Sequence, residues 1–163
     1  MISTICNYLL AKKVVFSLRS AKLRLGEGGF LFDIGNIKID KNILMKPGKL
    51  TDAEFDEIKK HPVLGGEIVA KQNHREEISK MILEHHESID GSGYPYKLSN
   101  GQISKYAKLI SIVDSYDAMT TDASYRRAMN STDVIEVMSK LPDFDQELFK
   151  NFKTMVCSNT IGK

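Results

Sequence analysis

The chain has 163 residues, of which 42% are hydrophobic, and its formal net charge is only +2. This length and apolar content suit one folded domain with its own core and argue against a disordered chain. The small net charge gives no basic stripe of the kind that binds nucleic acid. The two cysteines do not form a disulfide framework. No stretch reaches the roughly 18 apolar residues that a membrane span needs. We therefore expect a single domain over residues 1–163, in a reducing, cytoplasmic compartment, without nucleic-acid or membrane partners.

Helical patterns cover most of the chain. Residues 4–25 carry a partial 3.6-residue apolar stripe, and the glycines at positions 26, 28 and 29 are expected to break that helix. Residues 37–50 have no regular periodicity and end in a Lys-Pro-Gly-Lys turn signal. Thr51 and Glu54 then form a capping box, which predicts that a helix starts there.

The second half continues in the same way. Further helices are expected at about residues 63–72, 76–86, 104–121, 131–142 and 145–156, and Pro62 suits a first helical turn. No segment alternates in the manner of a strand. The pattern predicts an all-α fold, a bundle of about seven helices.

A dense cluster of polar residues stands out at residues 85–95, which read H-H-E-S-I-D-G-S-G-Y-P. Neutral imidazoles and carboxylates are ligands of divalent transition metals. Asp114 falls on an otherwise apolar helix, where a carboxylate is costly unless it is paired or bound to a metal. Taken singly, each candidate has an ordinary interpretation: Asp33 as a helix cap, and His61 as a residue before a proline. The set in this order favours a metal site.

Five blocks of sequence carry a more specific pattern. Residues 32–36 (F-D-I-G-N) resemble H-D-x-G-K, and residues 42–55 resemble I-L-x-K-P-G-x-L-T-x-x-E-F. The block H-P-x-x-G begins at His61, residues 85–95 match H-H-E-x-x-D-G-x-G-Y-P without a gap, and residues 112–128 are similar to V-A-D-x-x-D-A-L-T-S-D-R-P-Y-R-x-A. Between residues 29 and 152 the chain therefore resembles the HD-GYP phosphodiesterases of bacterial cyclic dinucleotide signalling.

The resemblance implies an HD-type helical bundle, shortened at its N-terminus, that hydrolyses cyclic di-GMP with one or two divalent ions, iron or manganese. It implies that the metal ligands are Asp33, His61, His85, His86 and Asp114. It gives Asp33 and Asn36 the catalytic positions, and Asn36 and Arg126 the contacts with the substrate. It also implies a GYP loop that consists of Asp90, Gly91, Gly93, Tyr94 and Pro95, a surface that in the family serves partner binding.

The chain also departs from the family pattern. Phe32 replaces the histidine of the HD pair, Asn36 replaces a lysine, and Ala123 replaces an arginine. The family has further ligands on earlier helices, but no histidine precedes Phe32 here. Two interpretations stay open: a phosphodiesterase of reduced or altered activity, or an inactive interaction module whose GYP loop contacts a diguanylate cyclase (GGDEF-type) domain. A truncated gene product is a third.

Overall fold

The computed structural model describes residues 19–72, 76–122 and 126–160. Within these ranges the chain is helical, with an isolated bridge between Asp90 and Ser99. The elements are α2 (Arg19–Leu31), η1 (Ile34–Lys38), α3 (Lys41–Leu44), α4 (Asp52–Ile58), α5 (His61–Ala70), α6 (Glu76–Glu84), α7 (Lys105–Thr120), α8 (Ser131–Met138) and α9 (Gln146–Thr160). The all-α prediction is confirmed, whereas most of the helix expected at residues 4–25 lies outside the described residues.

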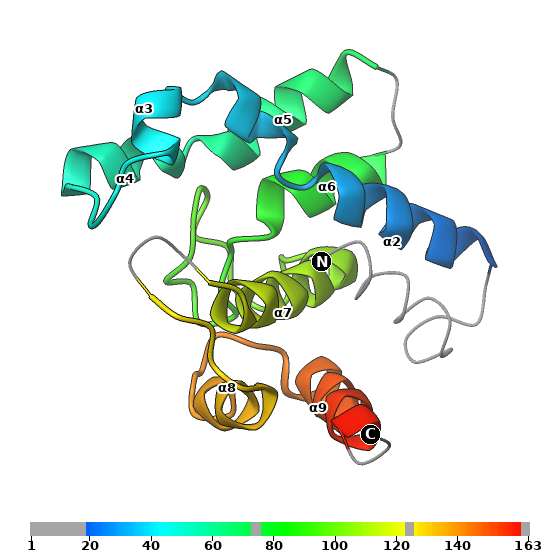
Figure 1. The fold of residues 1–163 in the computed structure, drawn as a ribbon. Coiled ribbons are helices and arrows are strands. Elements are labelled where there is room, and N and C mark those ends of the chain that lie inside the picture. Colours follow the sequence, from blue (N-terminus) through cyan, green and yellow to red (C-terminus); the bar gives the residue numbers. More distant parts are fainter. Residues whose placement is uncertain (1–18, 73–75, 123–125, 161–163) are drawn as a thin grey trace.

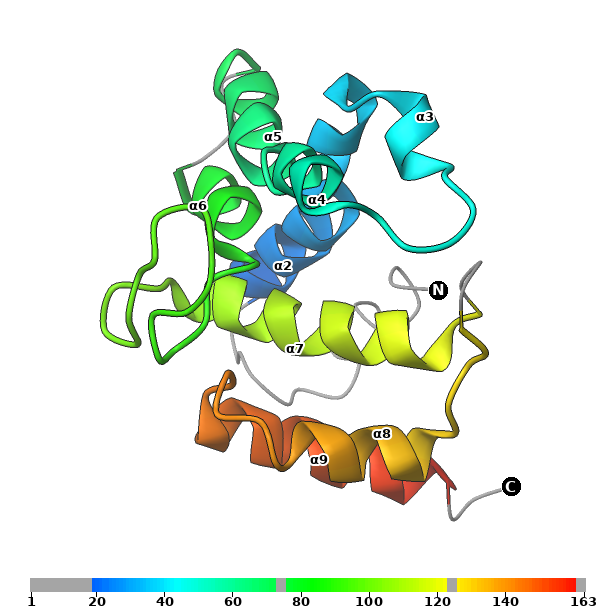
Figure 2. The same cartoon turned by 90° about the vertical axis from the view of Figure 1, so that its left-hand side faces the viewer.

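Helix α7 is the centre of the bundle. In Figure 1, and in the perpendicular view of Figure 2, it lies between the group α2 to α6 and the pair α8 and α9. It contacts α6 on one side and both α8 and α9 on the other. Its residues Ile110, Ile112 and Val113 are almost fully buried in the core that these helices share. A polar side chain on α7 that faces α6 therefore lies inside the molecule.

The local signals for helix starts are confirmed. The Thr51 hydroxyl accepts a hydrogen bond from the Glu54 amide, and the Glu54 carboxylate accepts one from the Thr51 amide at 2.7 Å. The Ser104 hydroxyl caps α7 through the amide of Ala107. Pro62 lies in the first turn of α5, where its missing N–H costs no helical hydrogen bond.

The predicted break at the glycines is wrong, because α2 continues through them to Leu31. A Cβ on Gly28 would lie 2.3 Å from the Met81 Sδ, so this glycine is what allows α2 to pack closely against α6. Packing between the helices thus outweighs the weak helix propensity of glycine. A short helix, α3, also forms in the stretch that lacked periodicity, with Asp40 as its N-cap.

None of the helices within the described ranges combines the length and apolar character that a membrane crossing requires.

Candidate metal centre

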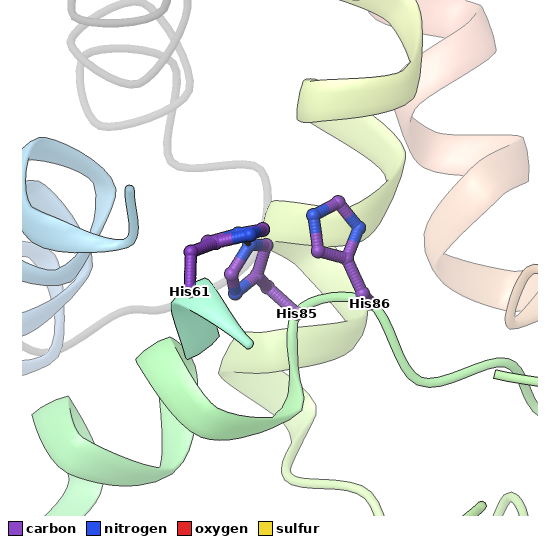
Figure 3. A group of neighbouring side chains, drawn as sticks. All are labelled: His61, His85 and His86. Carbon is purple, nitrogen blue, oxygen red and sulfur yellow. Dashed lines mark hydrogen bonds between the residues drawn. The ribbon is translucent and has the colours of Figure 1, made fainter. Parts of the chain in front are cut away.

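Three histidines from two elements converge at one place. His61 is the first residue of α5, and His85 and His86 follow directly after the end of α6 (Figure 3). One ring nitrogen from each lies within 4.8 Å of the others. His85 is fully buried and His61 nearly so, while His86 is partly exposed. The cluster therefore has a closed inner side and an open outer side.

The hydrogen bonds of His61 and His85 fix which ring nitrogen carries the proton. The Nδ1 of His61 lies 2.8 Å from the Ile58 carbonyl oxygen, and the Nδ1 of His85 lies 2.8 Å from the Ile82 carbonyl oxygen. A carbonyl only accepts, so each Nδ1 donates its proton. In the neutral rings both Nε2 atoms are left with lone pairs, and these atoms face each other at 3.1 Å. Two lone pairs at that distance repel unless a cation lies between them, as in a metal site.

The close approach of η1 to α5 brings Asp33 to this site. A Cβ on Gly35 would lie 1.9 Å from the His61 carbonyl oxygen, and the Gly35 and Gly65 backbones nearly touch as well. No side chain fits at position 35, so the glycine of the D-x-G motif is required by the contact itself. The carboxylate of Asp33 consequently lies 3.4 Å from the Nε2 of His61.

Asp33 is held as a ligand would be and does not act as a helix cap. Its side chain makes no capping hydrogen bond to η1. Instead, its Oδ1 accepts a hydrogen bond from the Asn36 Nδ2 at 3.1 Å. The other side-chain atom of that amide, Asn36 Oδ1, is buried and has no hydrogen-bond partner among the described residues. A buried oxygen without a hydrogen-bond partner is suited to accept a hydrogen bond from a water or from a hydrated ion.

Asp114 of α7 interacts electrostatically with Asp33 and with Tyr94. Burial, followed by the charges of Asp33 and Asp117, raises the pKa of Asp114 to about 7. Burial also raises the pKa of Asp33, against the opposite effects of His61 and of the hydrogen bond from Asn36. Carboxylates that repel one another in a partly buried place are stabilised by a bound cation.

The histidines show the complementary behaviour. Burial, with a smaller contribution from His61, lowers the pKa of His86 to about 3, and burial lowers the pKa of His85 well below its ordinary value. Neutral imidazole is the form that binds a metal. Three imidazoles and two carboxylates are ligand types that fit a divalent transition metal, so the residues present suit the ion that the sequence pattern implies.

The GYP loop folds back onto the histidines. The Tyr94 ring stacks on the His86 ring with their centroids 4.8 Å apart, and the Tyr94 amide donates to the His86 carbonyl. Gly91 has a positive φ of 82°, and a Cβ on Gly93 would lie 2.3 Å from the Ser88 amide nitrogen. Both glycines are therefore required by the backbone.

Other predicted residues of the loop have structural partners. Asp90 accepts hydrogen bonds from the amide and the hydroxyl of Ser92, which makes the turn that precedes Gly93. The Tyr94–Pro95 peptide bond is cis. The motif by itself does not reveal these features of the loop.

The structure places Arg126 apart from the cluster. The guanidinium of Arg126 donates to the carbonyls of Ala118, Met119 and Arg127, which places it at the C-terminal end of α7. Its predicted contact with a substrate phosphate stays a prediction. Ala123 lies outside the described residues.

Two buried glutamates had no assigned role in the sequence interpretation. Glu87 is 4% exposed, and its carboxylate accepts the backbone amides of Tyr96 at 2.7 Å and Leu98 at 2.9 Å. Glu84 accepts the amide of Ser104 at the start of α7. Both oxygens of Glu87 therefore serve the loop, although a carboxylate is a ligand type. The sequence signal for this role was the adjacent glycine-rich turn, because its backbone amides need hydrogen-bond acceptors.

Comparisons with known proteins agree with this geometry. A family model described as an HD domain matches residues 3–148. Cyclic di-GMP phosphodiesterase PA4108 of Pseudomonas aeruginosa is 34% identical over 164 residues, which cover 97% of this chain and 39% of that protein. The 3'3'-cGAMP-specific phosphodiesterase 3 of Vibrio cholerae is 30% identical over 132 residues, which cover 81% of this chain and 28% of that protein.

A solved structure of Bd1817, described as an HDG"Y"P protein from Bdellovibrio bacteriovorus, superposes with a TM-score of 0.75 at 20% identity, over 95% of this chain and 50% of that one. At this identity the likeness shows the fold alone. The chain spans less than half the length of the two curated relatives described above.

Proposed function

This chain belongs to the HD domain family, and from that premise we propose that it is a metal-dependent phosphodiesterase that hydrolyses cyclic di-GMP. The observation that carries the proposal is the pair of facing Nε2 atoms of His61 and His85, with His86 and Asp33 beside them. The names of the two curated relatives support a cyclic dinucleotide as the substrate class.

The proposed centre holds one ion, iron or manganese. Its ligands are the Nε2 atoms of His61 and His85, a nitrogen of His86, and the carboxylates of Asp33 and Asp114. In two-metal sites the ions lie about 3.5–4 Å apart, and each ion needs ligands of its own besides any ligand that bridges the two. Phe32, which stands where the family has a ligand, offers no lone pair and packs against His85. This supports a single ion.

A bound divalent ion would lower the pKa of a water ligand toward about 7 and so supply hydroxide at neutral pH. Hydrolysis would form a bond from a water oxygen to phosphorus and break the bond from phosphorus to the 3′ oxygen, which would take up a proton, and the product would be a linear dinucleotide. Asn36 orients Asp33 through its Nδ2, and the Asn36 Oδ1 remains to accept a hydrogen bond from the attacking water.

The substitution at position 36 has an expected cost. A hydrogen bond to a charged group contributes about 1.5–3 kcal/mol, which a neutral amide provides only in part. The chain should therefore bind the substrate phosphate more weakly than a protein with lysine there. We expect asparagine at position 36 to raise the KM and to leave the geometry of the site largely unchanged.

The test is hydrolysis of cyclic di-GMP by the chain, prepared without oxygen and reloaded with iron or manganese, beside a His85→Ala control. Turnover that the control abolishes would support the proposal, and 3'3'-cGAMP in parallel would test the choice of substrate. A chain that retains its metal but turns over neither substrate would contradict the proposal and favour the alternative of an interaction module.

We also propose that the GYP loop contacts a GGDEF-type domain. Tyr96 is 54% exposed and stands next to the ordered part of the loop, so it is available to a partner. Tyr94, by contrast, is stacked on His86, and its substitution would disturb the site as well. A pull-down with a GGDEF domain should weaken with Tyr96→Ser. Equal capture by the variant would contradict the contact.

A further inference from the structure

The three histidines differ in how they are held. His61 and His85 each donate Nδ1–H to a backbone carbonyl, which fixes the orientation of the ring. For His86, the described part of the chain shows no such carbonyl anchor. What contacts its ring from outside the cluster is the Tyr94 ring, nearly parallel at 25° and with centroids 4.8 Å apart. The least buried of the three histidines is therefore oriented by an aromatic stack.

The position of Tyr94 depends in turn on Glu87. This buried carboxylate accepts the amides of Tyr96 and Leu98, two and four residues beyond Tyr94. The Tyr94 amide is bound to the His86 carbonyl, so the loop is fixed on both sides of the tyrosine. Gly93 lies so close to the backbone at Glu87 and Ser88 that the loop has no room to shift inward.

We infer that Glu87 and Tyr94 are positioning residues of the metal centre. Glu87 fixes the loop, and the loop holds the Tyr94 ring against His86, which keeps that imidazole turned toward His61 and His85. Neither residue binds the ion. The inference rests on the proposed metal site, and it assigns roles to two residues that are not metal ligands.

The contacts also predict how the variants differ. Tyr94→Phe keeps the ring that stacks and removes the hydroxyl, so it should preserve the orientation of His86. Tyr94→Leu removes the stack. Glu87→Gln keeps one acceptor oxygen and turns its amide group toward a backbone N–H, so it should satisfy only one of the two amides, whereas Glu87→Ala satisfies neither.

Cobalt(II) is a suitable probe, because its visible absorption reports the ligands, and titration gives an affinity without any enzymatic assay. Substitution of residues that orient a metal ligand commonly lowers metal affinity about 10–100-fold. We expect a loss in that range for Tyr94→Leu and Glu87→Ala, an intermediate loss for Glu87→Gln, and nearly unchanged affinity for Tyr94→Phe. Tyr96→Leu, two residues along the same loop but half exposed, is the matched control and should bind as the wild type does.

A double variant tests whether the two residues act through one path. If Glu87 acts through Tyr94, then Glu87→Ala with Tyr94→Leu should lose no more affinity than the weaker-binding single variant. Full additivity of the two losses would contradict that coupling. Thermal unfolding of each metal-free variant, followed by circular dichroism, shows that the protein remains folded.

A second readout needs no metal. The stacked ring shifts the imidazole proton resonances of His86, and NMR of the metal-free protein should show this shift lost in Tyr94→Leu and kept in Tyr94→Phe. Wild-type affinity and an unchanged spectrum in Tyr94→Leu would overturn the inference, as would an equal loss in Tyr94→Phe. A wild-type chain that binds no cobalt would instead overturn the metal site and the inference together.

Discussion

The ring of Phe32 meets the ring of His85 edge to face, with their centroids 5.0 Å apart and an angle of 74° between the planes. Phe32 is only 3% exposed, so this contact closes the inner side of the histidine cluster. An aromatic edge stabilises the imidazole by packing but gives no lone pair to an ion. The residue that precedes Asp33 thus packs against the site and offers no ligand atom to an ion.

Replacement of Phe32 by histidine should therefore add a ligand. We expect Phe32→His to raise bound manganese from about one ion toward two per chain, because a second ion then gains an imidazole. Metal analysis after dialysis measures this. Phe32→Leu, which keeps an apolar side chain, is the control and should leave the content unchanged. Equal metal content in Phe32→His and wild type would contradict the explanation.

Gly35 provides a test of how the site is assembled. An added Cβ would lie 1.9 Å from the His61 carbonyl oxygen, which is a backbone atom that does not yield. We expect Gly35→Ala to lower the free energy of unfolding by about 1–3 kcal/mol or more, as overpacking does, and to weaken metal binding because Asp33 moves away from His61. Urea unfolding of the metal-free protein measures the first effect.

The matched control for that substitution is Gly101→Ala, because a Cβ there would meet no atom within 4 Å and the backbone has no positive φ. The control should change stability by no more than about 0.5 kcal/mol. If both variants were equally stable, the close contact of η1 with α5 would not be the constraint that we describe.

The raised pKa of Asp114 predicts that the free energy of unfolding of the metal-free protein depends on pH. Its pKa is about 7 in the folded chain, against about 3.9 when unfolded, so the folded state holds the proton more tightly. Its ionisation therefore destabilises the fold increasingly as pH rises from about 4 to about 7, and by a constant amount above that range. Asp114→Asn should be more stable than wild type at pH 8, by about 1–3 kcal/mol, with the difference vanishing near pH 4.

Chemical denaturation at several pH values measures this difference. The same substitution removes a proposed ligand, so added manganese should reverse the order and favour the wild type. A difference that is independent of pH would show that the carboxyl of Asp114 is not the group responsible.

Metal removal should lower the stability of the wild type. An ion that binds only the folded state adds about 2.7 kcal/mol at a free concentration of a hundred times its Kd. We expect a chelator to lower the Tm of the metal-loaded wild type and to leave the Tm of His85→Ala unchanged, since that variant lacks a central ligand. Identical chelator effects on both proteins would place the ion elsewhere.

The sequence predicted the helical class and most helix starts because the signals are local. The capping box at Thr51 depends on residues within one turn and formed as expected, and the helix expected over residues 104–121 is α7, which Ser104 caps. The passage of α2 through Gly28 was missed because its cause is Met81, more than fifty residues away. A contact of that kind leaves no periodicity in the sequence.

The same distinction applies to the site. The types and order of the histidines and aspartates pointed to a metal centre, and the structure brings His61, His85 and His86 together. The roles of the neighbouring residues were not visible, because Glu87 serves backbone amides and Phe32 serves packing. For Arg126, the motif position predicted a contact with substrate phosphate. It gave no indication that the guanidinium donates a hydrogen bond to a carbonyl at the end of α7.

The most direct test of the account is X-ray absorption spectroscopy of the zinc-loaded chain, beside His85→Ala. Zinc binds imidazole nitrogen at about 2.0–2.1 Å, and the outer atoms of each ring give a distinct scattering signal. The account predicts about three imidazoles around the ion in the wild type and fewer, with weaker binding, in the variant. A shell of oxygen atoms alone, or a spectrum that His85→Ala leaves unchanged, would contradict the claim that the facing nitrogens of His61 and His85 bind the metal.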